Sequence, residues 1–237
     1  MDEPLYEAAE TVGEQKKRVA VMVGRMNPPT RGHYKVMAAM KAFIRDNPGL
    51  NLEALPIVVI VAGEKSSADK TKNPLTADER KSFMESSGRA NGVKFLIASS
   101  AFAAFEEARK AGYEPIAIAA GSDRAGGYLK MLDKYFTKKD GSTIKHQAIP
   151  GLDRDQDDEV SDGNEAFDMI ARMIKDGDKI DDAQVSGTLA RYLASMVKQG
   201  SDEQMFTKAF AYVVGLDKKP VLATKMMKKI NDAQESK

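Results

Sequence analysis

The sequence predicts an α/β fold, in which helices cover both faces of a parallel sheet. Four short apolar runs occur in the first half of the chain, and each precedes a segment with helical periodicity. The runs are apolar throughout, which is typical of strands buried on both faces. Strands that alternate with helices imply right-handed crossovers, and hence a Rossmann-like sheet that binds ligands at the carboxyl ends of its strands.

The first strand is predicted at residues 19–23, where the apolar run lacks the helical period. Gly24 and the proline pair at 28–29 interrupt the run, and a spacing of three and four from Gly32 onward predicts a helix. His33 lies in its first turn. That turn directs unpaired backbone N–H groups and the positive end of the helix dipole at the loop. The sequence therefore predicts a phosphate-binding site there.

The second unit repeats this order. Residues 47–49, Asn-Pro-Gly, stop the first helix, and the second strand is predicted at 57–62. A polar loop follows. Thr76 and Glu79 then form a capping box that starts the next helix, which Gly88 is placed to end.

Two further strands complete the predicted sheet, with a candidate fifth. The third strand is predicted at 93–97, and Ser100 caps the helix after it. The fourth strand at 115–120 precedes a loop at 121–124, and residues 144–149 form the candidate fifth strand. The loops after the first and fourth strands would flank the crevice where the winding of the sheet reverses.

The two ends of the chain differ from this core. Residues 1–17 are charged and weakly periodic, and are interpreted as a leader. A capping box at 201–204 begins a helical C-terminal extension over residues 201–237. Its last helix is basic, begins at Pro220, and is expected to fray over residues 231–237.

The composition limits the classes of function. With 36 basic and 35 acidic residues, the chain shows no basic excess of the kind that nucleic-acid binding needs. No apolar run is long enough to cross a membrane, and the N-terminus is acidic where a signal peptide is basic. A soluble, cytoplasmic protein is therefore expected.

A protein-bound metal is also poorly supported. The chain has no cysteine, so disulfides and thiolate metal sites are excluded. It has two histidines, which are few for a metal site. The acidic run at 153–159 fails the calcium-loop pattern, because Asp158 stands where a glycine is needed. His146 is expected to be an exposed strand residue.

Three segments carry a resemblance to a known family. Residues 30–33, Thr-Arg-Gly-His, follow a strand and an Asn-Pro loop and resemble the (H/T)xGH signature of the nucleotidylyltransferase superfamily. Residues 72–76, Lys-Asn-Pro-Leu-Thr, precede Glu-Arg at 79–80, and residues 185–191, Val-Ser-Gly-Thr-Leu-Ala-Arg, resemble the ISSTxxR motif. The resemblance spans residues 18–200 and is nearest to the nicotinamide-nucleotide adenylyltransferase-like and cytidylyltransferase-like proteins of tailed phages.

The resemblance implies an enzyme that moves a nucleoside monophosphate from ATP or CTP to a small phosphorylated acceptor and releases pyrophosphate. ATP as donor and nicotinamide mononucleotide as acceptor are favoured, and Mg²⁺ would arrive with the triphosphate. A cytidylyltransferase acting on a sugar or alcohol phosphate is an alternative. Another is a nucleotide-binding or structural phage virion component with weakened catalysis.

The resemblance also bears on organisation and location. It implies one nucleotidylyltransferase-like domain over residues 18–200, within which residues 159–182 read as an insertion. An amphipathic helix at 164–175 would cover the site as a lid or decorate the surface. In a virion component, the insertion and the terminal helices would be docking surfaces, with homo-oligomers or virion assembly as partners. A phage origin would place the protein in the host cytoplasm or inside the particle.

The family's reaction explains the residue types of the first motif. Nucleotidyl transfer is an in-line displacement at the α-phosphorus, and its negative charge gathers on oxygens that need positioned donors. His33 would donate to the α-phosphate, and Gly32 would let the backbone approach closely. Thr30 stands where many relatives have a histidine, and a hydroxyl there stabilises charge less.

The last motif suits the β- and γ-phosphates. Ser186 and Thr188 place two hydroxyls at a helix start, and Arg191 follows one turn later on the same side. The loop after the fourth strand resembles the one that the family uses around the ribose and base, which implies that Asp123 accepts a hydrogen bond there. The remaining candidate nucleotide contacts are Gly24, Arg25, Met26, Asn27, Lys72, Gly121, Ser122, Arg124 and Val185.

Each of these roles has a plainer alternative. His33 is otherwise a capping or core histidine, and residues 186–191 are otherwise a serine-capped helix with a surface arginine. Residues 121–124 are otherwise a strand-to-helix turn with Asp123 as its cap. Lys65 and Lys70 could attract phosphates, but a solvated charged loop is the preferred interpretation for these two lysines.

Overall fold

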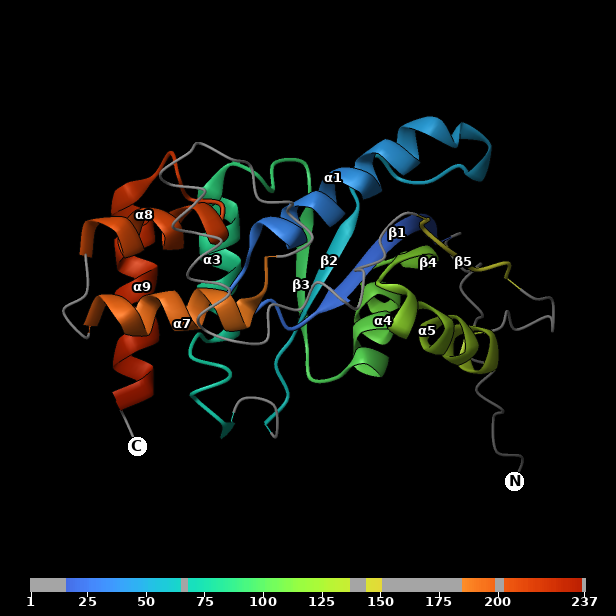
Figure 1. Cartoon of the computed structure of the whole chain (residues 1–237). Helices are drawn as coiled ribbons and strands as arrows, with labels where there is room; N and C mark the ends of the chain where they lie inside the picture. The colour runs from blue at the N-terminus through green and yellow to red at the C-terminus, as the bar shows by residue number, and fades with distance from the viewer. Residues whose placement is uncertain (1–15, 65–67, 137–143, 151–184, 199–202, 236–237) are drawn as a thin grey trace, which may run out of the picture.

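The predicted α/β fold is confirmed in a computed structural model, which describes residues 16–64, 68–136, 144–150, 185–198 and 203–235. Its sheet has five parallel strands in the order β3-β2-β1-β4-β5 (Figure 1). The strands are β1 (Lys17–Gly24), β2 (Ile57–Val61), β3 (Lys94–Ala98), β4 (Tyr113–Ala119) and β5 (Gln147–Ala148). The chain winds outward from β1 to β3 and then returns to the other side of β1. The winding therefore reverses between β1 and β4, as predicted.

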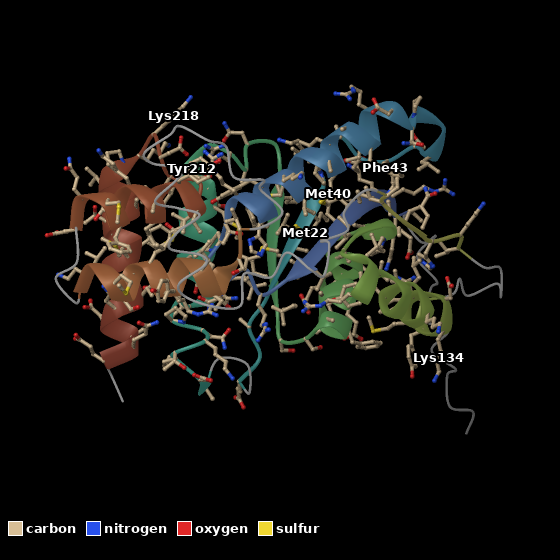
Figure 2. The ribbon with its side chains drawn as sticks, viewed as in Figure 1. Met22, Met40, Phe43, Lys134, Tyr212 and Lys218 are labelled. Atoms are coloured by element: carbon tan, nitrogen blue, oxygen red, sulfur yellow. The ribbon has the colours of Figure 1, made fainter. Side chains whose placement is uncertain are left out.

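Helices cover both faces of this sheet. On one face, α1 (Arg31–Asp46) and α3 (Ala77–Ser87) bury methionines against β1 and β2, including Met40 of α1 beside Met22 of β1 (Figure 2). On the other face, α4 (Ala101–Lys110) and α5 (Ser122–Tyr135) bury Phe105, Leu132 and their neighbours. A short 3-10 helix, η1 (Pro48–Leu50), follows α1.

The predicted caps set the helix boundaries. In α3, the Thr76 hydroxyl accepts from the Glu79 N–H at 3.2 Å, and the Glu79 carboxylate accepts from the Thr76 N–H at 3.0 Å. Gly88 ends this helix with a φ of 75°, a left-handed conformation that favours glycine. Ser100 caps α4 through the Ala103 N–H at 3.1 Å. These local signals are sufficient to predict the helix ends, because each cap lies within a few residues of its partner.

Three expectations about local structure were wrong. Residues 122–124 form the first turn of α5 and not a loop, with Gly121 as the N-cap. The last helix, α9 (Pro220–Glu235), does not fray at residue 231, because Asn231 donates to the Ala194 carbonyl of α7 at 3.0 Å. The side chain of His146 is 1% exposed, and its Nδ1 lies 2.7 Å from Asp133 of α5. In both of the last two cases, the residue contacts another helix.

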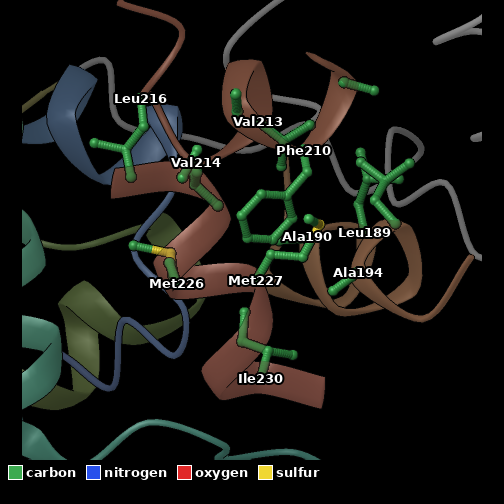
Figure 3. Close-up of a cluster of buried hydrophobic side chains, with 14 of the residues drawn as sticks. Leu189, Ala190, Ala194, Phe210, Val213, Val214, Leu216, Met226, Met227 and Ile230 are labelled. Atoms are coloured by element: carbon green, nitrogen blue, oxygen red, sulfur yellow. The ribbon is translucent and has the colours of Figure 1, made fainter. Parts of the chain in front are cut away.

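The C-terminal helices share one apolar core. The helices are α7 (Gly187–Lys198), α8 (Glu203–Val213) and α9, and Phe210 lies among them with Met227 and Ala190 (Figure 3). Leu75 and Phe83 of the α3 region complete this cluster. The helix that carries the predicted phosphate motif is thus packed with the two helices that follow residue 200.

Several predicted features lie outside the described residues. They include most of the leader, the acidic run at 153–159, the insertion at 159–182 with its helix, and the capping serine at 201. Within the described ranges, every helix is too short or too polar to cross a membrane.

Replacing Phe210 with alanine tests the C-terminal core. Its side chain is fully buried, so the substitution should lower the free energy of unfolding by about 3–5 kcal/mol. Val221→Ala is the control, because Val221 is 85% exposed and its loss should cost about 0.5 kcal/mol or less. Urea unfolding measures both. Equal midpoints for the two variants would contradict the packing described here.

Candidate functional site

The loop after β1 is held by a buried asparagine. Asn27 is 8% exposed, and its side chain donates to the carbonyl of Leu75 at 2.9 Å while accepting from the N–H of Leu75 at 3.1 Å. The side-chain amide thus pairs with the backbone as a neighbouring strand would. Since a buried backbone group needs a partner, this pair joins the loop to the segment before α3.

A buried arginine makes a second connection to the same loop. Arg80 of α3 is 2% exposed and donates to the carbonyls of Arg25, Val61 and Thr76, the last two at 3.1 Å. All of these partners are neutral, and burial lowers the pKa of Arg80 to about 10. Arg80 therefore brings a positive charge to the carboxyl ends of β1 and β2, and its hydrogen-bond partners among the described residues are all uncharged.

The start of α7 makes the third connection. Arg191 donates to the carbonyl of Asn27 at 2.6 Å and to the hydroxyl of Thr188 at 3.1 Å. The backbone approaches closely here, because a Cβ on Gly187 would lie 3.2 Å from the same carbonyl. The hydroxyl of Ser186 accepts from the Leu189 N–H at 3.1 Å and caps the helix.

The first motif forms the N-terminus of α1. Thr30 is the N-cap, and its backbone N–H donates to Nδ1 of His33 at 3.0 Å. Because a backbone N–H is always a donor, Nδ1 is the acceptor, and the neutral imidazole carries its proton on Nε2. The Thr30 hydroxyl is also 2.9 Å from Nδ1, and Thr30 is fully buried. His33 is thus a capping histidine whose other ring nitrogen is a hydrogen-bond donor.

Positive charge collects where the loop after β1 meets α3 and the start of α7. We refer to this meeting point as the junction. Burial lowers the pKa of Arg191, the nearby charge of Arg25 lowers it further, and Asp69 partly opposes the shift. Arg25 is exposed, whereas Arg191 is half-buried. Lys72 is also exposed, with its ammonium 3.7 Å from the carboxylate of Asp69. Arg25, Arg80 and Arg191 form a cationic group at the carboxyl ends of the strands. The described side-chain hydrogen bonds of Arg80 and Arg191 go to uncharged oxygens.

The other predicted contacts divide into two groups. Met26, with a φ of 51°, and Val185 are at most 2% exposed, so their side chains belong to the apolar core. Gly24 ends β1, and Gly32 is buried in the first turn of α1. On the side of β1 away from β2, α5 begins after β4, the neighbour of β1. Its first turn contains the predicted residues Ser122, Asp123 and Arg124, of which Arg124 is exposed.

Sequence reasoning missed three contributors. Arg80 belongs to the second motif, but nothing in the sequence indicates that it reaches the carbonyl of Arg25. Gly187 lay inside the third motif, where a glycine between two hydroxyl residues could have suggested a close backbone approach. Asp69 has no local pattern that would distinguish it from other loop acids.

The described part of the chain contains no group of three or more histidine, aspartate or glutamate side chains that could hold a metal ion. Groups that can hold an anion are present: the N-termini of α1 and α7 and the cationic side chains.

Changing Asn27 to aspartate tests the loop connection. A carboxylate would face the carbonyl of Leu75 where an amide now donates, so the free energy of unfolding should fall by about 1–3 kcal/mol at neutral pH. The loss relative to wild type should shrink towards pH 4, because a protonated carboxyl can donate again. Chemical unfolding at both pH values measures this difference, and a loss independent of pH would contradict the assigned hydrogen bond.

Changing Arg80 to lysine tests the second connection. One ammonium keeps the charge but cannot reproduce the fork of donors that reaches three carbonyls, so about 1–3 kcal/mol of stability should be lost. Lys81→Arg, at the next position of the same helix and on a surface pair, is the control and should be neutral. Unchanged stability of Arg80→Lys would show that its carbonyl contacts are dispensable.

Comparison with known proteins adds no relative: the chain matches no protein-family model, and no curated protein or solved structure is significantly similar to it. The fold is Rossmann-like by its strand order and parallel pairing.

Proposed function

We propose that the chain is a nucleotidylyltransferase that binds a nucleoside triphosphate at the loop following β1. One observation carries the proposal: Arg191 at the start of α7 donates to the carbonyl of Asn27 at 2.6 Å, three residues before the N-cap of α1. Two helix N-termini, far apart in the sequence, therefore meet at one short loop. Each favours negative charge, and a triphosphate is a ligand with enough charge to occupy both.

The proposed chemistry is an in-line displacement. An oxygen of the acceptor's phosphate attacks the α-phosphorus, the bond from that phosphorus to the bridging oxygen breaks, and pyrophosphate leaves with the electron pair. The Nε2–H of His33 donates to an α-phosphate oxygen, while Arg191, Thr188 and the N–H groups of α7 hold the leaving phosphates. Mg²⁺, carried by the phosphates, would neutralise part of their charge.

The donor and acceptor follow from the resemblance of the three motifs alone. ATP is the preferred donor over CTP, and the acceptor is a small phosphorylated molecule such as nicotinamide mononucleotide. A cytidylyltransferase that uses a sugar or alcohol phosphate is the alternative within the same reaction class. All of these reactions need the same triphosphate-binding site, so the geometry supports them equally.

A second candidate is a protein that binds the nucleotide without turning it over, including a structural component of a phage particle. The burial of Thr30 favours it. The Thr30 hydroxyl lies against His33, so it does not replace the second phosphate donor that a histidine supplies in many relatives. Binding would then persist while transfer is slow.

Replacing His33 with glutamine separates these roles. Glutamine at this position can accept from the Thr30 N–H as in a capping box, so the fold should be kept while the imidazole is lost. Pyrophosphate release, measured with four triphosphates against a panel of phosphorylated acceptors, should fall about a hundredfold or more for the active pair. His146→Gln, the same change at the other histidine of the chain, should leave the rate unchanged.

Two results would each contradict a different part of this proposal, the role of His33 or the transfer itself. Undiminished pyrophosphate release in His33→Gln would reduce His33 to a helix cap. Triphosphate binding by calorimetry without release for any acceptor would favour the nucleotide-binding alternative.

A further inference from the structure

One carboxylate in the turn between α8 and α9 binds two arginines of the α/β core. Asp217 accepts from Arg31 at 3.0 Å and from Arg89 at 2.7 Å through the same oxygen. Each arginine also uses its Nε to bind a carbonyl of this region, that of Tyr212 for Arg31 and that of Gly215 for Arg89. We refer to these three charged side chains, Asp217, Arg31 and Arg89, as the Asp217 clamp.

The turn fits closely against α1. The guanidinium of Arg31 lies 3.7 Å from the ring centroid of Tyr212, which is labelled in Figure 2. Gly215 has a φ of 69°, and a Cβ there would approach the ring of Tyr34 to 2.9 Å. Tyr34 is 5% exposed, and burial raises its pKa to about 12. The turn therefore contacts two residues, Arg31 and Tyr34, that flank Gly32 and His33 in α1.

The clamp is more than a surface ion pair. Burial alone would raise the pKa of Asp217, but hydrogen bonds from Arg89 and Arg31 outweigh it and lower the pKa below its ordinary value. Two charge-assisted hydrogen bonds to one oxygen, with both arginines fixed at a second point, restrict the geometry as a single exposed pair does not.

Anchoring the C-terminal helices does not require the clamp. Lys219 donates to the carbonyl of Ser86, and Lys229 pairs with Glu79 of α3. The shared apolar core of α7, α8 and α9 includes Phe83 of α3 as well. What the clamp adds is a contact with Arg31, which lies between the N-cap Thr30 and His33.

We propose that the turn between α8 and α9 is a positioning element of the nucleotide site. Asp217, acting through Arg31, fixes the first turn of α1 and thereby the imidazole of His33. Asp217 and Arg31 are positioning residues in this scheme, not catalytic ones. The inference rests on the proposed function for its kinetic consequence, but the ordering of α1 does not depend on any activity. The proposal gives the turn between α8 and α9 an indirect role at the site, which is to position His33.

The test compares Asp217→Ala with Asp46→Asn. Asp46 pairs with Arg45 at the opposite end of α1 and is the control for losing an Arg–Asp pair on this helix. Amide hydrogen exchange without ligand should be faster at residues 31–36 in Asp217→Ala only. The kcat for pyrophosphate release should fall about tenfold to a hundredfold, with KM for the triphosphate changed by less than about threefold, because the imidazole is displaced and the phosphate seat at α7 is kept.

Asp217→Glu is the conservative variant and should recover part of the kcat. If Asp217→Ala proves unstable, Arg31→Lys is the second variant, since lysine lacks the planar fork of donors through which Arg31 joins the Tyr212 carbonyl to Asp217. Unchanged exchange at residues 31–36 would overturn the clamp whatever the activity. Faster exchange with an unchanged kcat would overturn the positioning role. A wild type without pyrophosphate release would refute the proposed function alone, and exchange would then decide on the clamp.

Discussion

The structure of the site depends on the backbone of one short loop, whose polar groups are satisfied from three directions. The side chain of Asn27 pairs with the backbone of Leu75, and the backbone carbonyl of Asn27 accepts from Arg191. The carbonyl of Arg25 accepts from Arg80. A buried loop at the carboxyl end of a central strand must find such partners, because an unpaired carbonyl or N–H costs about 1–3 kcal/mol. Here the partners come from segments separated by more than one hundred residues along the chain.

This arrangement has an electrostatic consequence. Two of the three connections use guanidinium groups that bind uncharged oxygens, so they satisfy the loop without losing their positive charge. The N-termini of α1 and α7 add partial positive charge at the same place. The C-terminal helices support both sides of the junction, because α7 supplies Arg191 and the turn after α8 holds Arg31. A scaffold that gathers positive charge in this way is suited to a polyanionic ligand.

The sequence predicted what is local. Apolar runs and caps such as Thr76, Ser100 and Gly88 identified the strands and helix ends, because each signal depends on neighbours a few residues away. Contacts over long distances were not predictable: the role of Arg80, the burial of His146 and the ordered end of α9 all depend on partners in other elements. Arg191 lies against the loop after β1, and the Thr30 hydroxyl lies against His33, a contact that the motif resemblance did not indicate.

The most direct measurement is amide hydrogen exchange of the whole chain with and without ATP or CTP and Mg²⁺. If a triphosphate occupies the junction, the starts of α1 and α7 should both become protected at the same ligand concentration, since their N–H groups bind one molecule. Protection at only one of these helices, or at neither, would contradict a shared triphosphate site.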